Sequence, residues 1–292
     1  MSVEQLSIDQ IRELRMADPG AIRERLQRRR PFPGLGSQRR VLMIALDHPA
    51  RGSLRAGSDS EAMADRIDLL RRTAIALQRP GVDGFLGTAD LVEDLTLMGV
   101  LEAKWVLGSM NRGGLVGASF ELDDRFTGYD ASGIVQSGLD GGKMLVRIDL
   151  DDPASVRTLE ACARAVDELA ARGLWAMVEP FWSRRVAGVL SNDLSPEAVI
   201  RSITVASGLG RTSARTLLKL PATADMARVA AATTLPVLIL GGEVPEDPAA
   251  AESRWAEALA QPNVYGLVMG RSLLYPADGD VAGAVDRAVG LL

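Results

Sequence analysis

Eight short apolar runs, rich in Val, Ile and Leu, recur along the chain and alternate with segments of helical periodicity. Because the runs are almost continuously apolar, they favour parallel strands buried on both faces over strands with one face in water. None of the runs approaches the roughly 20 apolar residues that a membrane-spanning helix needs. The predicted strands are Val41–Asp47, Gly84–Thr88, Trp105–Ser109, Met144–Asp149, Leu174–Glu179, Thr216–Leu220, Val237–Leu240 and Gly266–Met269.

Between these runs, apolar residues recur three and four positions apart, which is the spacing of one face of a helix. Proline stands near the first turn of several of these segments, as in Asp152-Pro153 and Ser195-Pro196, and this position suits the start of a helix. The predicted helices are Ser60–Gln78, Ala154–Ala171, Pro196–Gly208, Asp225–Thr234, Pro248–Ala260 and Asp280–Leu291.

Consecutive strand–helix units from residue 41 onward predict an α/β fold, the (β/α)8 TIM barrel, which typically takes about 250 residues. A doubly wound open sheet is the alternative. The sequence weakens this alternative because no Gly-x-Gly-x-x-Gly turn follows the first predicted strand.

Residues 1–36 precede the barrel units, and we predict that they form a short N-terminal helical extension and linker ahead of a barrel domain over 37–292. Residues 4–30 indicate two short helices broken at Asp18-Pro19-Gly20, and the segment Arg28–Gly34 indicates a linker. We expect the extension to cover the bottom of the barrel or to join a subunit interface. Its three consecutive arginines either end a helix, where cations suit the helix dipole and solvent, or contact an anionic partner.

The composition of the 292 residues, 47% hydrophobic and 24% charged with a net charge of −5, is that of an ordinary globular protein and argues against a dedicated nucleic-acid-binding protein. Cys162 is the single cysteine, which excludes a disulfide framework and suits a reducing cytoplasm. His48 is the single histidine, so a site with several histidine ligands is excluded. Met1–Gln5 shows no basic region before an apolar stretch, so no signal peptide is predicted, and we expect a cytoplasmic protein without membrane contacts.

Only three of the 33 Lys and Arg residues are lysines: Lys104, Lys143 and Lys219. Lysine can act as an amine nucleophile once it loses its proton, whereas arginine keeps its proton near neutral pH. Lys219 lies inside an apolar run, where an amine costs free energy unless it is used or paired. A compositional bias that left three lysines at random explains the count equally well. Only the position of each lysine in the fold can distinguish these two explanations.

In a barrel, reactive groups gather at the C-terminal ends of the strands. Lys219 lies on the sixth predicted strand and Glu179 ends the fifth, so an amine and a carboxylate are neighbours there. This pair can form an iminium with a carbonyl substrate, while the carboxylate transfers the protons that the reaction requires. Lys143 and Arg147 share one face of the fourth strand by alternation, which makes Lys143 a candidate helper and Arg147 a candidate substrate contact or a partner of Glu179.

Two glycine turns indicate an anion site. Gly241-Gly242 ends the seventh strand and Gly270-Arg271 the eighth, and glycine lets backbone N–H groups approach a phosphate closely. Asp47 and His48 end the first strand and are candidates for orienting the substrate. Structural roles stay open for these residues as well: a turn cap for Asp47, a loop hydrogen bond for His48 and plain turns for the glycines.

Six motifs in sequence order are Ala45-Leu46-Asp47-His48-Pro49, Gly138-Leu139-Asp140-Gly141-Gly142-Lys143, Val178-Glu179-Pro180, Leu218-Lys219, Leu240-Gly241-Gly242 and Gly270-Arg271-Ser272. Together they resemble the class I (Schiff-base) aldolases of the deoxyribose-phosphate, tagatose-bisphosphate and archaeal-type fructose-bisphosphate aldolase superfamily. The resemblance extends from about residue 41 to the C-terminus and is strongest to the tagatose-bisphosphate branch. Arg147 and Ile148 depart from it, because relatives often carry aromatic residues there.

The resemblance implies that Lys219 forms the Schiff base, that Glu179 transfers protons and that Lys143 and Asp47 lie in the site. It implies a phosphate held at Gly242 and Arg271, no metal or other cofactor, and a homo-oligomer. We therefore predict a class I aldolase that cleaves a phosphorylated ketose or keto acid into dihydroxyacetone phosphate and an aldehyde.

Three alternatives remain open. The first is a phosphate-binding barrel isomerase or a lyase that forms no Schiff base. The second is an aldolase for a sulfonated sugar phosphate or an inositol-derived keto-gluconate phosphate. The third is a non-catalytic regulatory barrel.

Overall fold

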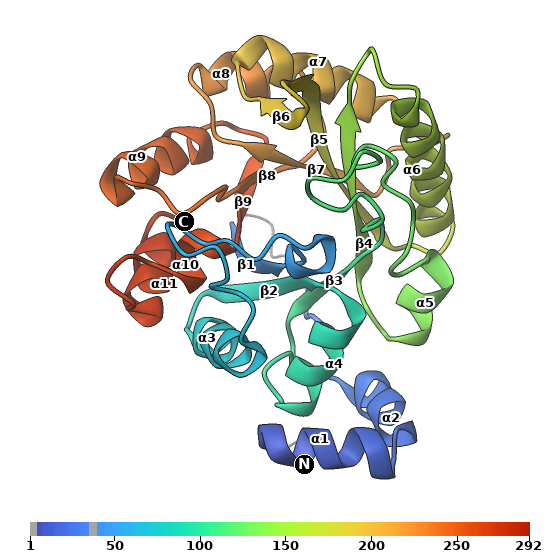
Figure 1. Ribbon diagram of the computed structural model, residues 1–292, viewed down its shortest axis with the longest axis vertical. Coiled ribbons are helices and arrows are strands. Elements are labelled where there is room, and N and C mark those ends of the chain that lie inside the picture. The colour runs from blue at the N-terminus through green and yellow to red at the C-terminus, as the bar shows by residue number, and fades with distance from the viewer. Residues whose placement is uncertain (1–4, 35–39) are drawn as a thin grey trace.

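The eight predicted strands pair as parallel neighbours and close into a barrel (Figure 1). The computed structural model describes residues 5–34 and 40–292. Around the barrel the strands are β1 (Val41–Leu46), β2 (Val82–Gly87), β3 (Trp105–Ser109), β4 (Gly141–Ile148), β5 (Trp175–Val186), β7 (Thr216–Pro221), β8 (Val237–Leu240) and β9 (Val264–Met269). The last barrel strand, β9, pairs with the first, β1, so the barrel has no unpaired edge strand. The (β/α)8 barrel is confirmed, and the open sheet is excluded.

Helices follow the strands and cover the outside of the barrel (Figure 1). Three of them were not predicted: α4 (Ala89–Leu97), α5 (Ala131–Gln136) and the one-turn α10 (Arg271–Leu274). The others are α3 (Arg66–Gln78), α6 (Ala154–Ala170), α7 (Pro196–Ser207), α8 (Met226–Ala230), α9 (Pro248–Leu259) and α11 (Val281–Gly290). No helix within the described ranges combines the length and the apolar character needed to span a bilayer.

The predicted start of α3 at Ser60 was wrong. The carboxylate of Asp65 accepts hydrogen bonds from the backbone N–H groups of Ile67 and Asp68, which caps the helix and places its first residue at Arg66. Helix α8 is shorter than the predicted Asp225–Thr234 for a related reason, because Asp225 caps it and the following turn ends it by Ala231.

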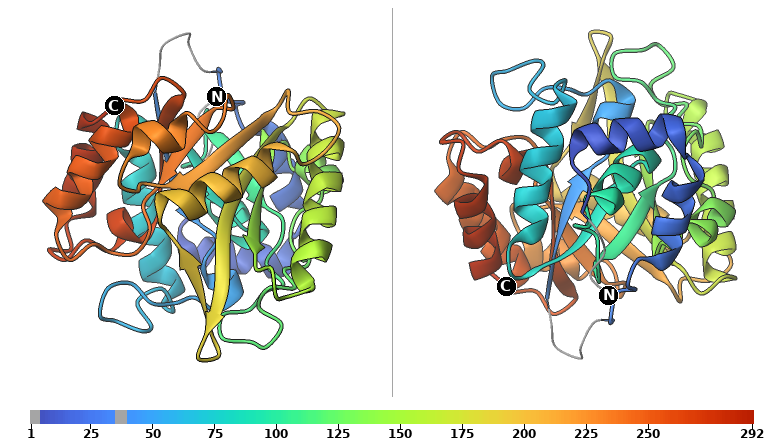
Figure 2. Two further views of the ribbon diagram at one scale, coloured as in Figure 1. Left: turned by 90° about the horizontal axis from the view of Figure 1, so that it is seen from above. Right: turned by 90° about the horizontal axis from the view of Figure 1, so that it is seen from below.

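The predicted strand ending at Glu179 was too short. Strand β5 continues to Val186 and pairs in antiparallel fashion with β6 (Val189–Asp193). The turn is made by Ala187 and Gly188, both with positive φ, as a two-residue hairpin turn requires. Figure 2 shows this hairpin projecting from the same end of the barrel as the loops that follow β1 and β3. The hairpin therefore forms part of the rim at the C-terminal ends of the strands.

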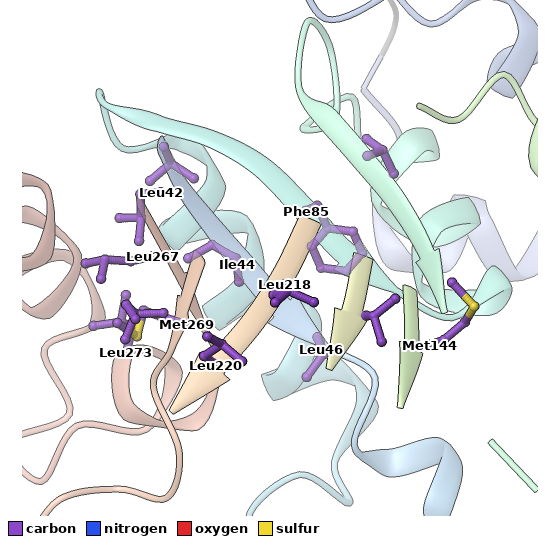
Figure 3. Close-up of a cluster of buried hydrophobic side chains, with 14 of the residues drawn as sticks. Leu42, Ile44, Leu46, Phe85, Met144, Leu218, Leu220, Leu267, Met269 and Leu273 are labelled. Atoms are coloured by element: carbon purple, nitrogen blue, oxygen red, sulfur yellow. The ribbon is translucent and has the colours of Figure 1, made fainter. Parts of the chain in front are cut away.

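Side chains alternate between two apolar layers along each barrel strand. Leu42, Ile44 and Leu46 of β1, and Leu218 and Leu220 of β7, belong to one outer cluster between the strands and the helices (Figure 3). The residues between them point into the barrel and form a separate inner cluster that includes Val41, Met43, Ala45, Leu217 and Met177. By the same alternation, the next inward positions toward the C-terminal ends of β1, β5 and β7 are Asp47, Glu179 and Lys219.

The N-terminal extension forms α1 (Ile8–Ala17) and α2 (Gly20–Arg28), so the predicted break at Asp18-Pro19-Gly20 is confirmed. The extension packs on the outside of the barrel beside α4, where Leu6 N–H donates to Leu97 O at 3.1 Å. Phe32 stacks on Trp105 at the start of β3, which is the bottom of the barrel. The predicted boundary between residues 36 and 37 lies outside the described residues.

The interpretation that the three arginines end a helix is confirmed, because α2 ends at Arg28 and Arg29 is its C-cap, but the Arg29 side chain is buried rather than solvated. It is 6% exposed and donates to the backbone oxygens of Lys104 and Gly138, each at 2.8 Å. This side chain therefore ties the extension to the barrel.

Candidate active site

A cavity of about 250 Å³ opens at the C-terminal end of the barrel. All ten residues that the sequence predicted as site residues line it: Asp47, His48, Lys143, Arg147, Glu179, Lys219, Gly241, Gly242, Gly270 and Arg271. They come from six different strands or strand ends, so only the closed barrel brings them together.

Charged side chains of alternating sign run along the floor of this cavity. Lys219 Nζ lies 2.8 Å from Glu179 Oε1, and the other oxygen of Glu179 contacts Lys143 Nζ. Lys143 Nζ also donates to Asp47 Oδ2 at 3.1 Å. All four side chains are at most 10% exposed, and loss of the Glu179 carboxylate would leave Lys219 buried without its partner.

The two carboxylates are held ionised by their neighbours. Burial alone would raise the pKa of Glu179, but the ammonium groups of Lys143 and Lys219 outweigh it and bring this pKa well below its usual range. Burial likewise opposes ionisation of Asp47, yet Arg112 and Lys143 lower its pKa well below the ordinary value. Ser109 Oγ also donates to Asp47 Oδ2 at 2.9 Å. In the free site, Glu179 and Asp47 are therefore ionised at neutral pH and act as hydrogen-bond acceptors.

Lys143 has an altered proton affinity. Burial first and the charge of Arg112 second lower the pKa of Lys143 to about 8, against the opposing effect of Asp47 and Glu179. A group with such a pKa is present in both protonation states near neutral pH, as an acid/base group requires.

We therefore expect turnover on any substrate of this site to fall as the pH rises through about 8, where Lys143 loses its proton. The Lys143→Met variant should turn over more slowly and should lack this alkaline limb. The measurement is the pH profile of kcat for both proteins. If the Lys143→Met variant showed the same fall of kcat at alkaline pH, that fall would belong to the titration of another group.

His48 is neutral at physiological pH. Its ring lies at the mouth of the cavity with a quarter of its side-chain surface exposed, and its Nδ1 is 4.0 Å from Asp47 Oδ1. Removal of the ring from water, assisted by the charges of Arg271 and Lys219, lowers the pKa of His48 to about 3 despite the attraction of Asp47. His48 therefore meets a substrate as a neutral hydrogen-bonding group.

The predicted anion site is a narrow backbone cradle. A Cβ on Gly270 would come within 2.6 Å of Ala45 O, and one on Gly241 within 2.6 Å of Ser272 Oγ, so larger residues do not fit there. Arg271 lies beside these turns and pairs with Glu243, whose side chain is 65% exposed. An arriving anion would compete with an exposed carboxylate for Arg271.

Arg147 lines the cavity, and of its two predicted alternatives the pairing with Glu179 is excluded because another carboxylate holds its guanidinium group. Its guanidinium donates to Glu121 Oε1 at 2.7 Å and to the backbone oxygen of Glu121, and Asp124 lies 3.8 Å away. Glu121 and Asp124 belong to the long loop after β3, whose contact with β4 the sequence did not indicate.

Sequence reasoning missed two further cations that line the cavity, Arg51 and Arg112. Each follows a strand end that was examined for polar groups, after β1 and β3, but among 30 arginines neither had a distinguishing motif. Arg112 NH1 lies 3.2 Å from Asp47 Oδ2 and thus joins the charged floor. The described part of the chain contains no group of three His, Cys, Asp or Glu side chains that could hold a metal ion.

The fold and cavity define a TIM barrel with a buried lysine–carboxylate centre beneath a cationic pocket. The chain belongs to the Cgl0159-like family, whose model matches residues 39–289. The crystal structure of Cgl0159 from Corynebacterium glutamicum is 52% identical in sequence, with 97% of this chain and 95% of that chain covered and a TM-score of 0.94. No curated protein matches the chain.

Two fructose-1,6-bisphosphate aldolases share the fold at low identity. One, described as Schiff-base forming, is 18% identical with a TM-score of 0.64 over 92% of this chain and 99% of that chain. The other is an archaeal enzyme with its catalytic Lys covalently bound to the carbinolamine intermediate, 17% identical with a TM-score of 0.64 over 92% of this chain and 98% of that chain. At these identities the likeness establishes the aldolase-like barrel fold, and the finer resemblance to the tagatose-bisphosphate branch stays a prediction.

Proposed function

We propose that this protein is a class I aldolase that cleaves a phosphorylated ketose or keto acid through a Schiff base on Lys219. The observation that supports it most is the position of Lys219 Nζ, buried on β7 at 2.8 Å from Glu179 Oε1 inside a cavity with access to solvent. A buried amine with a neighbouring carboxylate is the arrangement that iminium chemistry needs.

The proposed reaction starts when the neutral amine of Lys219 attacks the substrate ketone, giving a carbinolamine that loses water to form an iminium. A base then takes the proton of the hydroxyl group on the carbon two positions from the iminium carbon. The bond between that carbon and the carbon next to the iminium breaks, and the hydroxyl-bearing carbon becomes the aldehyde that leaves. The electron pair of the broken bond forms the carbon–carbon double bond of an enamine, and the π pair of the iminium moves onto its nitrogen. Protonation of the enamine and hydrolysis release the second product and regenerate Lys219.

The neighbours of Lys219 have distinct proposed tasks. Glu179 accepts and returns protons at the carbinolamine stage, with Lys143 as the group that exchanges protons with it. Asp47 and His48 orient substrate hydroxyl groups. The turns at Gly241-Gly242 and Gly270-Arg271 hold a phosphate on the product that keeps the Schiff base, for which dihydroxyacetone phosphate is the proposed identity.

The charge of the cavity supports an anionic substrate. Among the described residues that line it, six carry a positive charge and three a negative one, although the whole chain has a net charge of −5. A concave site with an excess of positive charge concentrates anions and stabilises them once bound.

Borohydride reduction in the presence of dihydroxyacetone phosphate tests this function. We expect a stable adduct on Lys219, because borohydride converts an iminium into a secondary amine. Trypsin does not cleave after a modified lysine, so the adduct should appear on the uncleaved peptide spanning residues 216–228. Protein treated with borohydride alone is the control. Turnover of a sugar phosphate without any adduct would instead favour an isomerase or a lyase in which Lys219 is an ordinary acid/base.

A further inference from the structure

We propose that Arg112 is a positioning residue, which shares the charge of Asp47 and so keeps Lys143 ready to give up a proton. Glu179, the other carboxylate beside Lys143, is the acceptor of that proton. The proposal rests on the proposed function for the use of the proton, which Glu179 passes to the carbinolamine on Lys219. It deepens that function by naming a residue that acts through its neighbours rather than on the substrate.

Three donors among the described residues share one oxygen of Asp47. Ser109 Oγ, at the end of β3, donates to Asp47 Oδ2 at 2.9 Å, and Lys143 Nζ donates to the same oxygen at 3.1 Å. Arg112 NH1, on the loop after β3, lies 3.2 Å from it. Because the negative charge of Asp47 is divided among these donors, Asp47 holds the Lys143 proton less tightly than it would in an isolated buried pair.

The guanidinium group of Arg112 is fixed in place by the loop that carries it. Asn111 bridges this loop to β4, because its Nδ2 donates to Leu145 O at 2.6 Å and its Oδ1 accepts from the Leu145 N–H at 2.8 Å. The backbone oxygen of Asn111 in turn accepts from Arg112 Nε at 2.6 Å. Asn111 is 0% exposed and Arg112 6%. The bridge lies beyond Ser109 and Lys143, the last pair of the β3–β4 ladder, and holds Arg112 against the charged floor.

The charges that face Lys143 come from four elements. Arg112 after β3 and Lys219 on β7 repel its proton, and Arg112 has the larger effect of the two. Asp47 on β1 and Glu179 on β5 attract it. Removal of the Arg112 charge would act on Lys143 twice in the same direction, because the repulsion is lost and Asp47 is shared with one cation fewer. Lys143 would then keep its proton to a higher pH and transfer it less readily.

The proposed transfer runs from Lys143 toward Lys219. An N–H bond of the Lys143 ammonium group breaks and an O–H bond forms on Glu179, which leaves a neutral amine and a neutral carboxylic acid. The acid then gives its proton to the carbinolamine hydroxyl on Lys219, which leaves as water while the iminium forms. Glu179 suits this role because its two oxygens contact the two lysines separately.

The scarcity of lysine makes a direct test possible. NMR spectra of the full chain with isotopically labelled lysine ε-carbons contain signals from only three residues, and each shift reports the protonation of one amine. Lys104→Arg and Lys219→Arg each remove one signal, which identifies that of Lys143. We expect the Lys143 signal of the wild-type protein to titrate with a midpoint near pH 8. In Arg112→Gln the midpoint should be higher by about one pH unit or more.

Two further variants separate charge from packing. Arg112→Lys keeps the positive charge but loses the shape of the guanidinium group, so its midpoint should stay closer to that of the wild type than to that of Arg112→Gln. Arg51→Gln is the matched control, because it removes a cation that lines the same cavity but is not among the donors to Asp47 Oδ2 described above. Its midpoint should stay near the wild-type value. The alkaline fall of kcat should move with the NMR midpoint in each variant.

A wild-type midpoint at the ordinary lysine value of 10.5 would overturn the proposal, whether or not any variant folds. So would an Arg112→Gln midpoint equal to that of the wild type, or a rise that Arg112→Lys or Arg51→Gln reproduces in full. The expected rise together with no borohydride adduct would retain the effect of Arg112 on Lys143 and reject the Schiff-base function. An adduct on Lys219 together with an unmoved midpoint would do the opposite.

Discussion

Replacement of Lys219 with Arg is expected to abolish the borohydride adduct and to lower turnover at least about a thousandfold, because the variant keeps a cation beside Glu179 but has no amine nucleophile. Retention of the positive charge matters for the interpretation. Glu179 stays paired in the variant, so a loss of activity reports the chemistry of the amine rather than a collapse of the charged floor.

The control for this experiment is Lys104→Arg. Lys104 precedes β3 at the opposite end of the barrel, where its Nζ donates to Val82 O at 2.6 Å. Its replacement should leave both the adduct and turnover unchanged. Substantial turnover by Lys219→Arg, or an adduct that remains in Lys219→Met, would reject Lys219 as the nucleophile and direct attention to Lys143.

Replacement of Glu179 with Gln is expected to lower the free energy of unfolding at pH 7 by about 3 to 5 kcal/mol. The substitution leaves Lys143 and Lys219 buried and facing each other without the carboxylate that lies between them. The midpoint of urea unfolding measures the effect. Glu160→Gln is the control, because Glu160 forms an exposed pair with Arg164 and should change stability by less than about 1 kcal/mol.

The difference between wild type and Glu179→Gln should depend on pH in a defined direction. The folded state holds the pKa of Glu179 below its ordinary value of 4.5, so the folded protein binds fewer protons here than the unfolded chain does. This stabilisation is fully present above pH 4.5 and decreases as the pH falls below that value. We therefore expect the two proteins to differ less at pH 3 than at pH 7.

A double variant, Glu179→Gln with Lys143→Met, should be less destabilised than Glu179→Gln alone. Additive losses of stability would contradict the interaction of these two side chains in the charged floor.

Most of the barrel could be predicted because its strands and helices leave local signals. The eight apolar runs correspond to the eight barrel strands, and the strand ends pointed to the correct rim. The β5–β6 hairpin was missed because its turn, Ala187-Gly188, lacks the common Asn-Gly or Asp-Gly signal, and because its residues follow a polar strand end where a loop was expected.

The site was predicted less completely than the fold. The glycine turns, Lys219 and Glu179 stood out because their residue types are unusual at buried strand ends. Arg51 and Arg112 did not, because arginine is abundant in this chain and a guanidinium group in a loop is ordinarily solvated. Their roles depend on the loops after β1 and β3 folding over the same cavity, which no local pattern indicates.

The sequence by itself determined the strand–helix alternation, and hence a parallel barrel, together with the residue types available at its C-terminal rim. It did not determine which way each side chain faces, because strands buried on both faces show no alternation of polar and apolar residues. Only the closed barrel decides that Asp47, Lys143, Glu179 and Lys219 all point inward and meet in one line of alternating charge. The physical reason is that these contacts join residues up to 96 positions apart, and closure of the sheet is what brings them within hydrogen-bond distance.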